Sequence, residues 1–504
     1  MTTIASSDSR PADSSRRAGR ALPKLGVGQK VGYATGAVLD GVASQAINIF
    51  LFFYATAVCG LPAALVGFAL AAGLVVDAVV DPLIGSASDA LRSRFGRRLP
   101  FMALGLPGTM LSLVMLFSLP AGWPTGRLVA WLTAASIGLR TSISLFVLPY
   151  NAAGAELSDD YDERSSIAAW RWGIGMLAAM ATVLLGFGVF LSGPGGLSQR
   201  GAYLPFAATL AALVALGAGA SMWSLHRMAA RQHVAVAGTD AAHLRLLRQL
   251  GELFRNASFR TLFLAALLLF TASAIHSTLG IHANTYFWRM SSGQIQVVTL
   301  SLFGGLLLGA PLAGPMLRRL EKRTVLVIGV IGLGSALAVP TTLRLIGLLP
   351  DRGAPPVALL AGAILLGGML MATAAIAFAS MMADAADEHE YLFGVRQEGL
   401  YFAGWAFASK AASGFGSLIS GLALQVIGFP AGSSGAHAAA VGAEAGAAPL
   451  QLPPGTVTAI GIIYGPVAGV LALAAAVMCL FYRLDATRHG EILRALAERR
   501  GNAS

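Results

Sequence analysis

The chain has 504 residues, of which 56% are hydrophobic and only 12% are charged, and its mean hydropathy is +0.70. Soluble domains keep about a quarter of their residues charged, so this composition excludes soluble, disordered and disulfide-rich proteins. The net charge of +11 comes from short loops between apolar segments and not from a separate basic domain, which argues against a nucleic-acid partner. The sequence therefore predicts an all-α integral membrane protein.

Twelve apolar segments follow one another along the chain, each about long enough to cross a bilayer as a helix. They cover residues 33–58, 62–87, 100–120, 126–155, 167–192, 203–225, 259–288, 293–316, 324–349, 356–383, 397–428 and 454–482. A long polar stretch after the sixth segment divides them into two sets of six. The predicted domains are a tail over 1–32, an N-terminal bundle over 33–225, a central loop over 226–258, a C-terminal bundle over 259–482 and a tail over 483–504.

The basic residues are concentrated in alternate loops. The loops on the side of both termini hold most of the 35 lysines and arginines. Because positively charged loops stay in the cytoplasm, we expect cytoplasmic termini in a bacterial cytoplasmic membrane. The first 30 residues lack the apolar core of a signal peptide, so we interpret them as a flexible cytoplasmic tail.

Two aspartates, Asp77 and Asp81, lie inside the second segment. Their spacing places both on one helical face, and a charge at mid-membrane needs a cavity or a partner. Adjacent carboxylates repel unless a proton or a cation binds between them, and oxygen ligands select a hard ion. We predict a site for H⁺ or Na⁺, in which the aspartates are metal ligands only if the ion is Na⁺. The alternative is static pairing with Arg140, Arg171 or Lys410.

Other polar and aromatic residues in the segments are candidates for coupling and substrate binding. Lys410 and Arg171 are candidate coupling residues, because a base can neutralise a carboxylate site that has lost its cation; a static ion pair is the alternative for Lys410. Asp40 is a candidate substrate-binding acid, unless it simply reaches water at a helix end. Tyr150 and Trp405 are candidate pocket aromatics, with packing as the alternative.

Proton relay and enzymatic chemistry have weaker signals. His276 and His282 in the seventh segment are candidate proton relays, although a lone histidine is more often a satisfied polar group. The sequence has no P-loop, no H-E-x-x-H and no G-x-S-x-G motif. An ATP-driven pump is therefore disfavoured.

The loop between the second and third segments has a distinctive pattern. Gly85 and Asp89 precede a run of arginines, and the equivalent loop of the second half, residues 309–323, ends in a similar basic run. This pattern resembles the signature of the major facilitator superfamily. The resemblance implies 12 transmembrane helices in two six-helix halves that alternate access to a central site. We expect the gating loops to use Asp89, Arg94, Arg97, Arg98, Arg164 and Arg396.

Three stretches narrow this resemblance. They cover residues 77–100, 147–171 and 382–410. They resemble the glycoside-pentoside-hexuronide:cation symporters, the melibiose-permease group of the superfamily. The resemblance implies that Asp77 and Asp81 bind the coupling cation with a hydroxyl from Ser144. It also implies a coupling role for Lys410, and Arg171 falls within one residue of the family's helix-5 arginine.

The chain departs from this family at the sugar site. Val80 replaces an asparagine of the sodium users, which favours H⁺ slightly. Val147 replaces a sugar-binding acid, and Asn151 and Ala375 replace aromatic residues, so the pocket is more apolar than a galactoside site. The expected substrate-binding residues are Asp40, Tyr150, Asn151, Arg171 and Trp405.

These features predict a cation-coupled secondary symporter for a sugar, a glycoside or a related small organic solute, and not an enzyme. We expect no cofactor besides the coupling ion H⁺ or Na⁺, no nucleic-acid partner and a monomeric transport unit. Two alternatives are a symporter of lysolipids or other amphiphiles with the same fold and a membrane sensor that transports nothing. The intramembrane charges argue against a sensor, which would be freer to lose them.

Overall fold

The computed structural model describes residues 24–91, 93, 96–158, 160–193, 196–228, 251, 253–350, 354–395, 397–430 and 451–501. All regular secondary structure in these ranges is helical, which confirms the predicted fold class. Most of the predicted N-terminal tail and of the predicted central loop lies outside the described residues, as do Arg94 and Arg396.

The first half of the chain forms one group of helices. Its elements are α1 (Val27–Ala34), α2 (Ala37–Gln45), η2 (Ala46–Leu51), η3 (Tyr54–Val58), α3 (Ala63–Ala90), α4 (Leu99–Leu116), α5 (Thr125–Glu156), α6 (Tyr161–Leu185), η4 (Gly186–Phe190), η5 (Gly196–Ser198), η6 (Arg200–Ala202) and α7 (Tyr203–Arg227). Local sequence sets the helix starts. Asp160, for example, caps α6 by accepting a hydrogen bond from the Glu163 backbone N–H at 2.8 Å.

The second half forms the other group. Its elements are α9 (Ala257–His282), η8 (Ala283–Phe287), α10 (Ser292–Arg319), α11 (Lys322–Leu345), α12 (Ala354–Phe393), α13 (Glu398–Val426), α15 (Pro454–Ile462), η9 (Ile463–Val467), α16 (Ala468–Leu480) and α17 (Ala486–Gly501). Asn256 caps α9, and Ser291 with Gln294 forms a capping box that begins α10.

The helices match the predicted spans. Within the described residues, 11 helices are long and apolar enough to cross a membrane. The twelfth predicted span, α13, has 29 residues but is less apolar, because it carries Lys410 among serines and glycines. A less apolar spanning helix suits a position between other helices, and α13 packs against α3 and α9.

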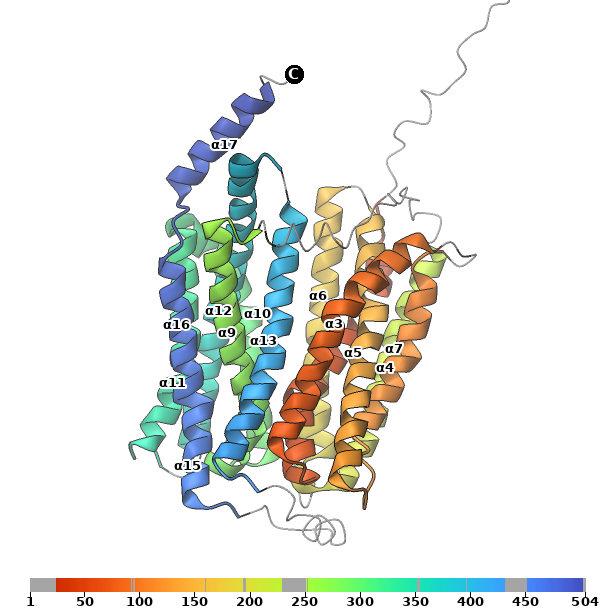
Figure 1. Cartoon of the computed structure of the whole chain (residues 1–504), viewed down its shortest axis with the longest axis vertical. Coiled ribbons are helices and arrows are strands. Elements are labelled where there is room, and N and C mark those ends of the chain that lie inside the picture. The colour runs from red at the N-terminus through yellow and green to blue at the C-terminus, as the bar shows by residue number, and fades with distance from the viewer. Residues whose placement is uncertain are drawn as a thin grey trace, which may run out of the picture.

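The two groups stand side by side, with α3 and α13 adjacent where they meet (Figure 1). We call the end of the bundle that carries α17 the α17 end, and the end at which α13 ends and α15 begins the opposite end. Within the described residues, three sets of polar contacts join the groups: Lys410 with Asp77 and Asp81, Thr56 with His282, and Ser292 with Leu191.

Close helix packing joins the two groups near the opposite end. A Cβ atom built on Gly67 of α3 would lie 2.7 Å from the Ser417 carbonyl oxygen of α13. A Cβ on Gly421 of α13 would overlap the Ala63 carbonyl oxygen of α3. Only glycine lets the two backbones approach this closely, so small residues allow direct contact between the groups.

Candidate cation and substrate site

The predicted aspartate pair lies midway along α3. Asp77 is only 4% exposed, and its Oδ2 atom lies 3.1 Å from Nη1 of Arg140 on α5. Lys410 of α13 forms an ion pair with Asp81, and its Nζ atom lies 4.0 Å from Oδ2 of Asp77. Helices α3, α5 and α13 therefore bring two carboxylates and two bases into one cluster, which joins the two groups.

The cluster is balanced in charge but not fully hydrogen-bonded. Two carboxylates and two cations sum to zero, which lowers the cost of keeping four charges inside a membrane. The Oδ1 atoms of Asp77 and Asp81 are buried, and neither has a hydrogen-bond partner in the described part of the chain. These two oxygens are free to accept a proton or to contact a cation.

Gly73, which the sequence analysis missed, makes room for this cluster. A Cβ atom at Gly73 would lie 2.5 Å from Cδ and 2.9 Å from Nε of Arg140. The arginine therefore crosses α3 where that helix has no side chain, one turn before Asp77. The only signal in the sequence was a glycine four residues before an intramembrane aspartate. Nothing in the sequence indicated that Arg140 packs against Gly73.

Ser144 lies on α5 one turn beyond Arg140 and is 5% exposed. No hydrogen bond between Ser144 and either aspartate is present among the described residues. Its predicted role as a cation ligand therefore stays a prediction.

Arg171 lies outside the aspartate cluster. Its Nη1 atom donates to Oδ1 of Asn151 at 2.7 Å, which joins α6 to α5 within the first group. Two predicted substrate residues are thus brought together. Asp40 is exposed on α2 and accepts a hydrogen bond from Ser44 at 2.9 Å.

The two predicted pocket aromatics are packed. Tyr150 is 2% exposed and stacks on Tyr33 with 4.6 Å between ring centroids. Trp405 packs against Phe378 at 5.3 Å and borders a small space of about 60 Å³ inside the second group. Neither residue borders the larger cavity described next, and their substrate roles stay predictions.

A cavity of about 470 Å³, here called the central cavity, lies between the groups and extends into the second group. Gln45 and Asn48 of the first group border it, as do His276 and Asn284 of the second. Helix α13 contributes Ser409, which is next to Lys410, and Ser413, which lies one turn before Ser417. One helix therefore borders the cavity and also supplies the base of the aspartate cluster.

The two candidate relay histidines both have hydrogen-bond partners. His276 Nδ1 lies 3.1 Å from the Tyr464 carbonyl oxygen. His282 is fully buried, and its Nε2 atom lies 2.8 Å from the Thr56 hydroxyl across the boundary between the groups. This geometry gives both rings a structural partner, and a relay role stays a prediction.

The predicted gating residues of the first group form a network at the α17 end. Arg98 is 7% exposed and forms an ion pair with Asp89 and a second one, of 2.8 Å, with Glu156. Arg97 lies 3.1 Å from the same Glu156 oxygen. Arg164 donates to the Ser158 carbonyl oxygen at 2.6 Å. Glu156 was not among the predicted gating residues, although it ends α5.

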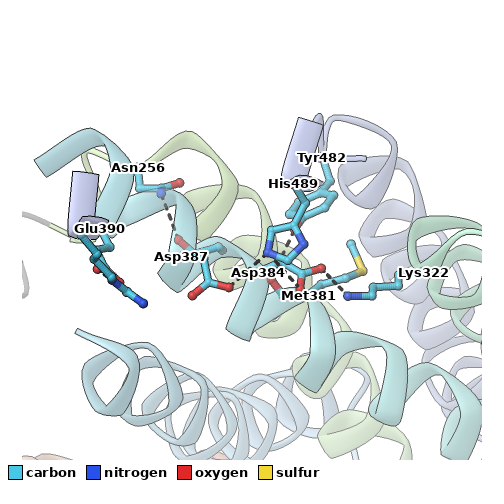
Figure 2. A network of polar contacts seen from close by, with 10 residues as sticks. Asn256, Lys322, Met381, Asp384, Asp387, Glu390, Tyr482 and His489 are labelled. Carbon is cyan, nitrogen blue, oxygen red and sulfur yellow. Dashed lines mark hydrogen bonds and ion pairs between the residues drawn. The ribbon is translucent and has the colours of Figure 1, made fainter. Parts of the chain in front are cut away.

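The second group has its own network at this end (Figure 2). Asp384 of α12 accepts a hydrogen bond from Lys322 at 2.6 Å, and His489 of α17 lies 3.1 Å from Asp387 and 3.7 Å from Asp384. Tyr482 donates to the Met381 carbonyl oxygen at 3.3 Å; burial raises the pKa of Tyr482, so the phenol keeps its proton. Residues 486–501, predicted to be part of a tail, are thus a helix that packs on α12.

A helical bundle in two groups, with a charge cluster and a cavity between them, defines a secondary transporter of the alternating-access type. The chain belongs to the MFS/sugar transport protein family, whose model matches residues 32–486. This membership confirms the predicted family and the predicted class, a cation-coupled sugar symporter that is not an enzyme.

Individual relatives agree with this assignment. The glucuronide carrier protein homolog of Escherichia coli (strain K12) is 28% identical over 404 residues, which cover 79% of this chain and 83% of that protein. The uncharacterized symporter YnaJ of Bacillus subtilis (strain 168) is 25% identical over 497 residues, which cover 95% and 96%. A bacterial homologue of the iron transporter ferroportin in its inward-facing state has a TM-score of 0.61 at 14% identity, covering 91% of this chain and 99% of that one, which shows the shared fold.

Proposed function

We propose that this protein couples the movement of a sugar or glycoside to the movement of H⁺ through Asp77 and Asp81. The observation that carries the proposal is the contact of Lys410 with both aspartates, because it joins the two groups through the predicted cation ligands. Lys410 also lies on the helix that borders the central cavity through Ser409 and Ser413. A movement of Lys410 in response to protonation of the aspartates would therefore also move the cavity wall.

The coupling step follows from the charge balance. When Asp81 takes up a proton, Lys410 loses its partner and becomes an uncompensated cation inside the membrane. Lys410 then moves toward Asp77 or toward water, and α13 moves with it relative to α3. This movement separates α3 from α13 at the opposite end, with the two six-helix groups acting as rigid halves of one monomeric unit.

Several features favour H⁺ over Na⁺. Na⁺ needs several oxygen ligands, whereas a proton needs only one of the free Oδ1 atoms. Val80 supplies no side-chain oxygen, and Ser144 makes no hydrogen bond to the aspartates in the described part of the chain. The distribution of basic loops supports a cytoplasmic α17 end in a bacterial cell, and with this orientation solute uptake would follow the inward proton gradient.

The test uses purified protein in liposomes with an imposed pH gradient or an imposed Na⁺ gradient, and radiolabelled glucose, galactose, xylose and their p-nitrophenyl glycosides as probes. Wild type is expected to accumulate at least one probe with the pH gradient. Asp81→Asn is expected to exchange the same probe across the membrane without accumulating it, because the neutral side chain cannot take up the coupling proton.

The matched control is Glu491→Gln, which neutralises an acid that is 55% exposed on α17. This variant is expected to accumulate the probe like wild type. Full accumulation by Asp81→Asn would contradict the coupling role of the aspartates. Accumulation that follows Na⁺ and not pH would replace H⁺ by Na⁺ as the coupling ion.

A further inference from the structure

One buried hydrogen bond joins the two groups near the opposite end. It links Oγ1 of Thr56, in the first spanning helix of the first group, to Nε2 of His282, in the first spanning helix of the second group, over 2.8 Å. Thr56 is 1% exposed and His282 is 0% exposed, whereas the side chain of Lys410, which also joins the groups, is 43% exposed. Because water cannot replace a buried partner, losing either side chain of this bond leaves the other polar group unsatisfied.

A second hydrogen bond determines which atom is the donor. The Thr56 hydroxyl donates to the Phe52 carbonyl oxygen at 2.7 Å, one turn earlier in the same helix. A hydroxyl has a single proton, so its oxygen accepts from His282, and Nε2 carries the proton of the neutral ring. Nδ1 of His282 is then an acceptor, and it is buried without a hydrogen-bond partner in the described part of the chain. The groups therefore meet here with one polar atom unsatisfied, which water would satisfy if they separated.

Aromatic rings from both groups enclose His282. Phe53 and Phe52 of the first group lie 5.0 Å and 5.6 Å from it, measured between ring centroids. Phe429 and Tyr286 of the second group lie 5.3 Å and 6.5 Å away. Separating the groups at this point would expose these rings to water, which the hydrophobic effect opposes. The rings and the hydrogen bond thus hold the groups together at one place, and the unsatisfied Nδ1 atom offsets part of this stabilisation.

Both partners lie at a change of helix geometry. Thr56 is in the π-helical segment η3, and the π-helical segment η8 begins directly after His282. A π-helical turn has i→i+5 hydrogen bonds, is frequent at functional sites and is one of the recognised causes of bending in a helix. The two partners therefore occupy corresponding positions in the two halves, on helices that can bend near their contact.

We infer that His282 and Thr56 form a gate between the two groups at the opposite end. Their hydrogen bond stabilises the arrangement in which the groups are in contact at this end, and its loss shifts the protein toward an arrangement in which they are apart. His282 is thus a positioning residue for transport and not a proton relay. The inference rests on the alternating-access class of the chain and on neither the coupling ion nor the solute.

The test measures the distance between the groups by pulsed electron paramagnetic resonance on the purified full chain in lipid nanodiscs, without solute. Spin labels are attached to Ala121→Cys in the first group and to Leu348→Cys in the second, both exposed at the opposite end, after α4 and after α11. Cys59 and Cys479 are replaced by alanine in every protein compared. Thr56→Val keeps the shape but removes the acceptor, and it is expected to raise the ratio of the longer to the shorter distance at least about fivefold.

Matched variants separate the hydrogen bond from side-chain shape. Thr56→Ser keeps the hydroxyl and is expected to behave like wild type. Thr109→Val is the control, because Thr109 is 0% exposed and donates to the Gly105 carbonyl oxygen at 2.9 Å, but it lies within the first group; no shift is expected. A second pair leaves Thr56 intact. His282→Gln carries an amide that reaches the place of Nε2 and is expected to keep the shorter distance, whereas the shorter amide of His282→Asn is expected to lose it.

The outcomes separate the gate from other roles. Equal distance distributions in Thr56→Val and Thr109→Val, or equal shifts in Thr56→Ser and Thr56→Val, would overturn the inference. Loss of pH-driven accumulation by His282→Gln at an unchanged distance would assign His282 a relay role and also overturn it. The expected distance shifts, found together with no accumulation of any probe by wild type, would support the gate while contradicting the proposed symport.

Discussion

The two ends of the bundle are held by different forces. At the opposite end, α3 and α13 touch through the backbones around Gly67 and Gly421, so the two groups are in direct contact. At the α17 end, Arg98 pairs with Glu156 inside the first group, and Lys322 pairs with Asp384 inside the second. Neither of these ion pairs joins the groups.

This difference indicates how the two ends can alternate. Packing between backbones is short-ranged and is lost as soon as the helices separate. Ion pairs can exchange partners, because a carboxylate at the surface of one group can meet a base from the other when the groups approach. At one end, therefore, the two groups meet through close backbone packing, and at the other end the two ion pairs named above each lie within one group.

The largest expected effect comes from breaking the packed end. Gly421→Ala places a methyl group against the Ala63 carbonyl oxygen and separates α3 from α13. Because overpacking costs about 1–3 kcal/mol, we expect probe exchange in liposomes to slow by about tenfold. Gly362→Ala on α12, where a Cβ meets nothing within 4 Å, is the control and is expected to exchange normally. Normal exchange by Gly421→Ala would show that this contact does not close the end.

A smaller effect is expected from the first group's network at the α17 end. Glu156→Gln removes the carboxylate that Arg97 and Arg98 share, and Asp89 remains as a partner for Arg98. We expect the free energy of unfolding to fall by about 1–2 kcal/mol, measured by thermal denaturation in detergent. The exposed pair of Arg488 and Glu491 is the comparison, and Glu491→Gln should cause no measurable change. Equal melting temperatures of Glu156→Gln and Glu491→Gln would mean that the network does not stabilise this end.

The smallest effect is expected in the second group. His489→Ala removes the contact of α17 with Asp387, while Lys322 still binds Asp384. We expect hydrogen exchange over residues 486–501 to quicken roughly threefold, which corresponds to about 0.6 kcal/mol. Arg488→Ala removes only an exposed contact of the same helix and should leave exchange unchanged. Equal exchange rates in the two variants would show that His489 does not stabilise the packing of α17.

Most of the architecture was predictable from the sequence, because long apolar segments in water-free surroundings have to be helical. Asp77, Asp81 and Lys410 were predictable for a related reason, since a charge inside an apolar segment needs a partner. Which base pairs with Asp77 was left open, and the structure selects Arg140 and not Arg171. That choice depends on how helices pack in three dimensions.

Other features depend on packing and had little local signal. The sequence analysis assigned residues 483–504 to a tail without predicting a helix there, whereas residues 486–501 form α17, in which Ile492 and Leu496 lie four residues apart and are both buried. Asn284 was not singled out, because its position in the cavity wall follows from how η8 meets the other helices. Tyr150 drew attention as an aromatic residue but is buried against Tyr33. The type of a residue can be read from the sequence, but the surface that its side chain faces depends on how the helices pack.

The most direct test of the coupling mechanism measures proton uptake by the purified protein in lightly buffered detergent solution. The uptake is followed on adding a p-nitrophenyl glycoside that the protein binds. If Asp81 takes up the coupling proton and releases Lys410, wild type should take up about one proton per bound probe, and Asp81→Asn should bind the probe without proton uptake. Equal proton uptake by both proteins, or none by wild type, would contradict the account.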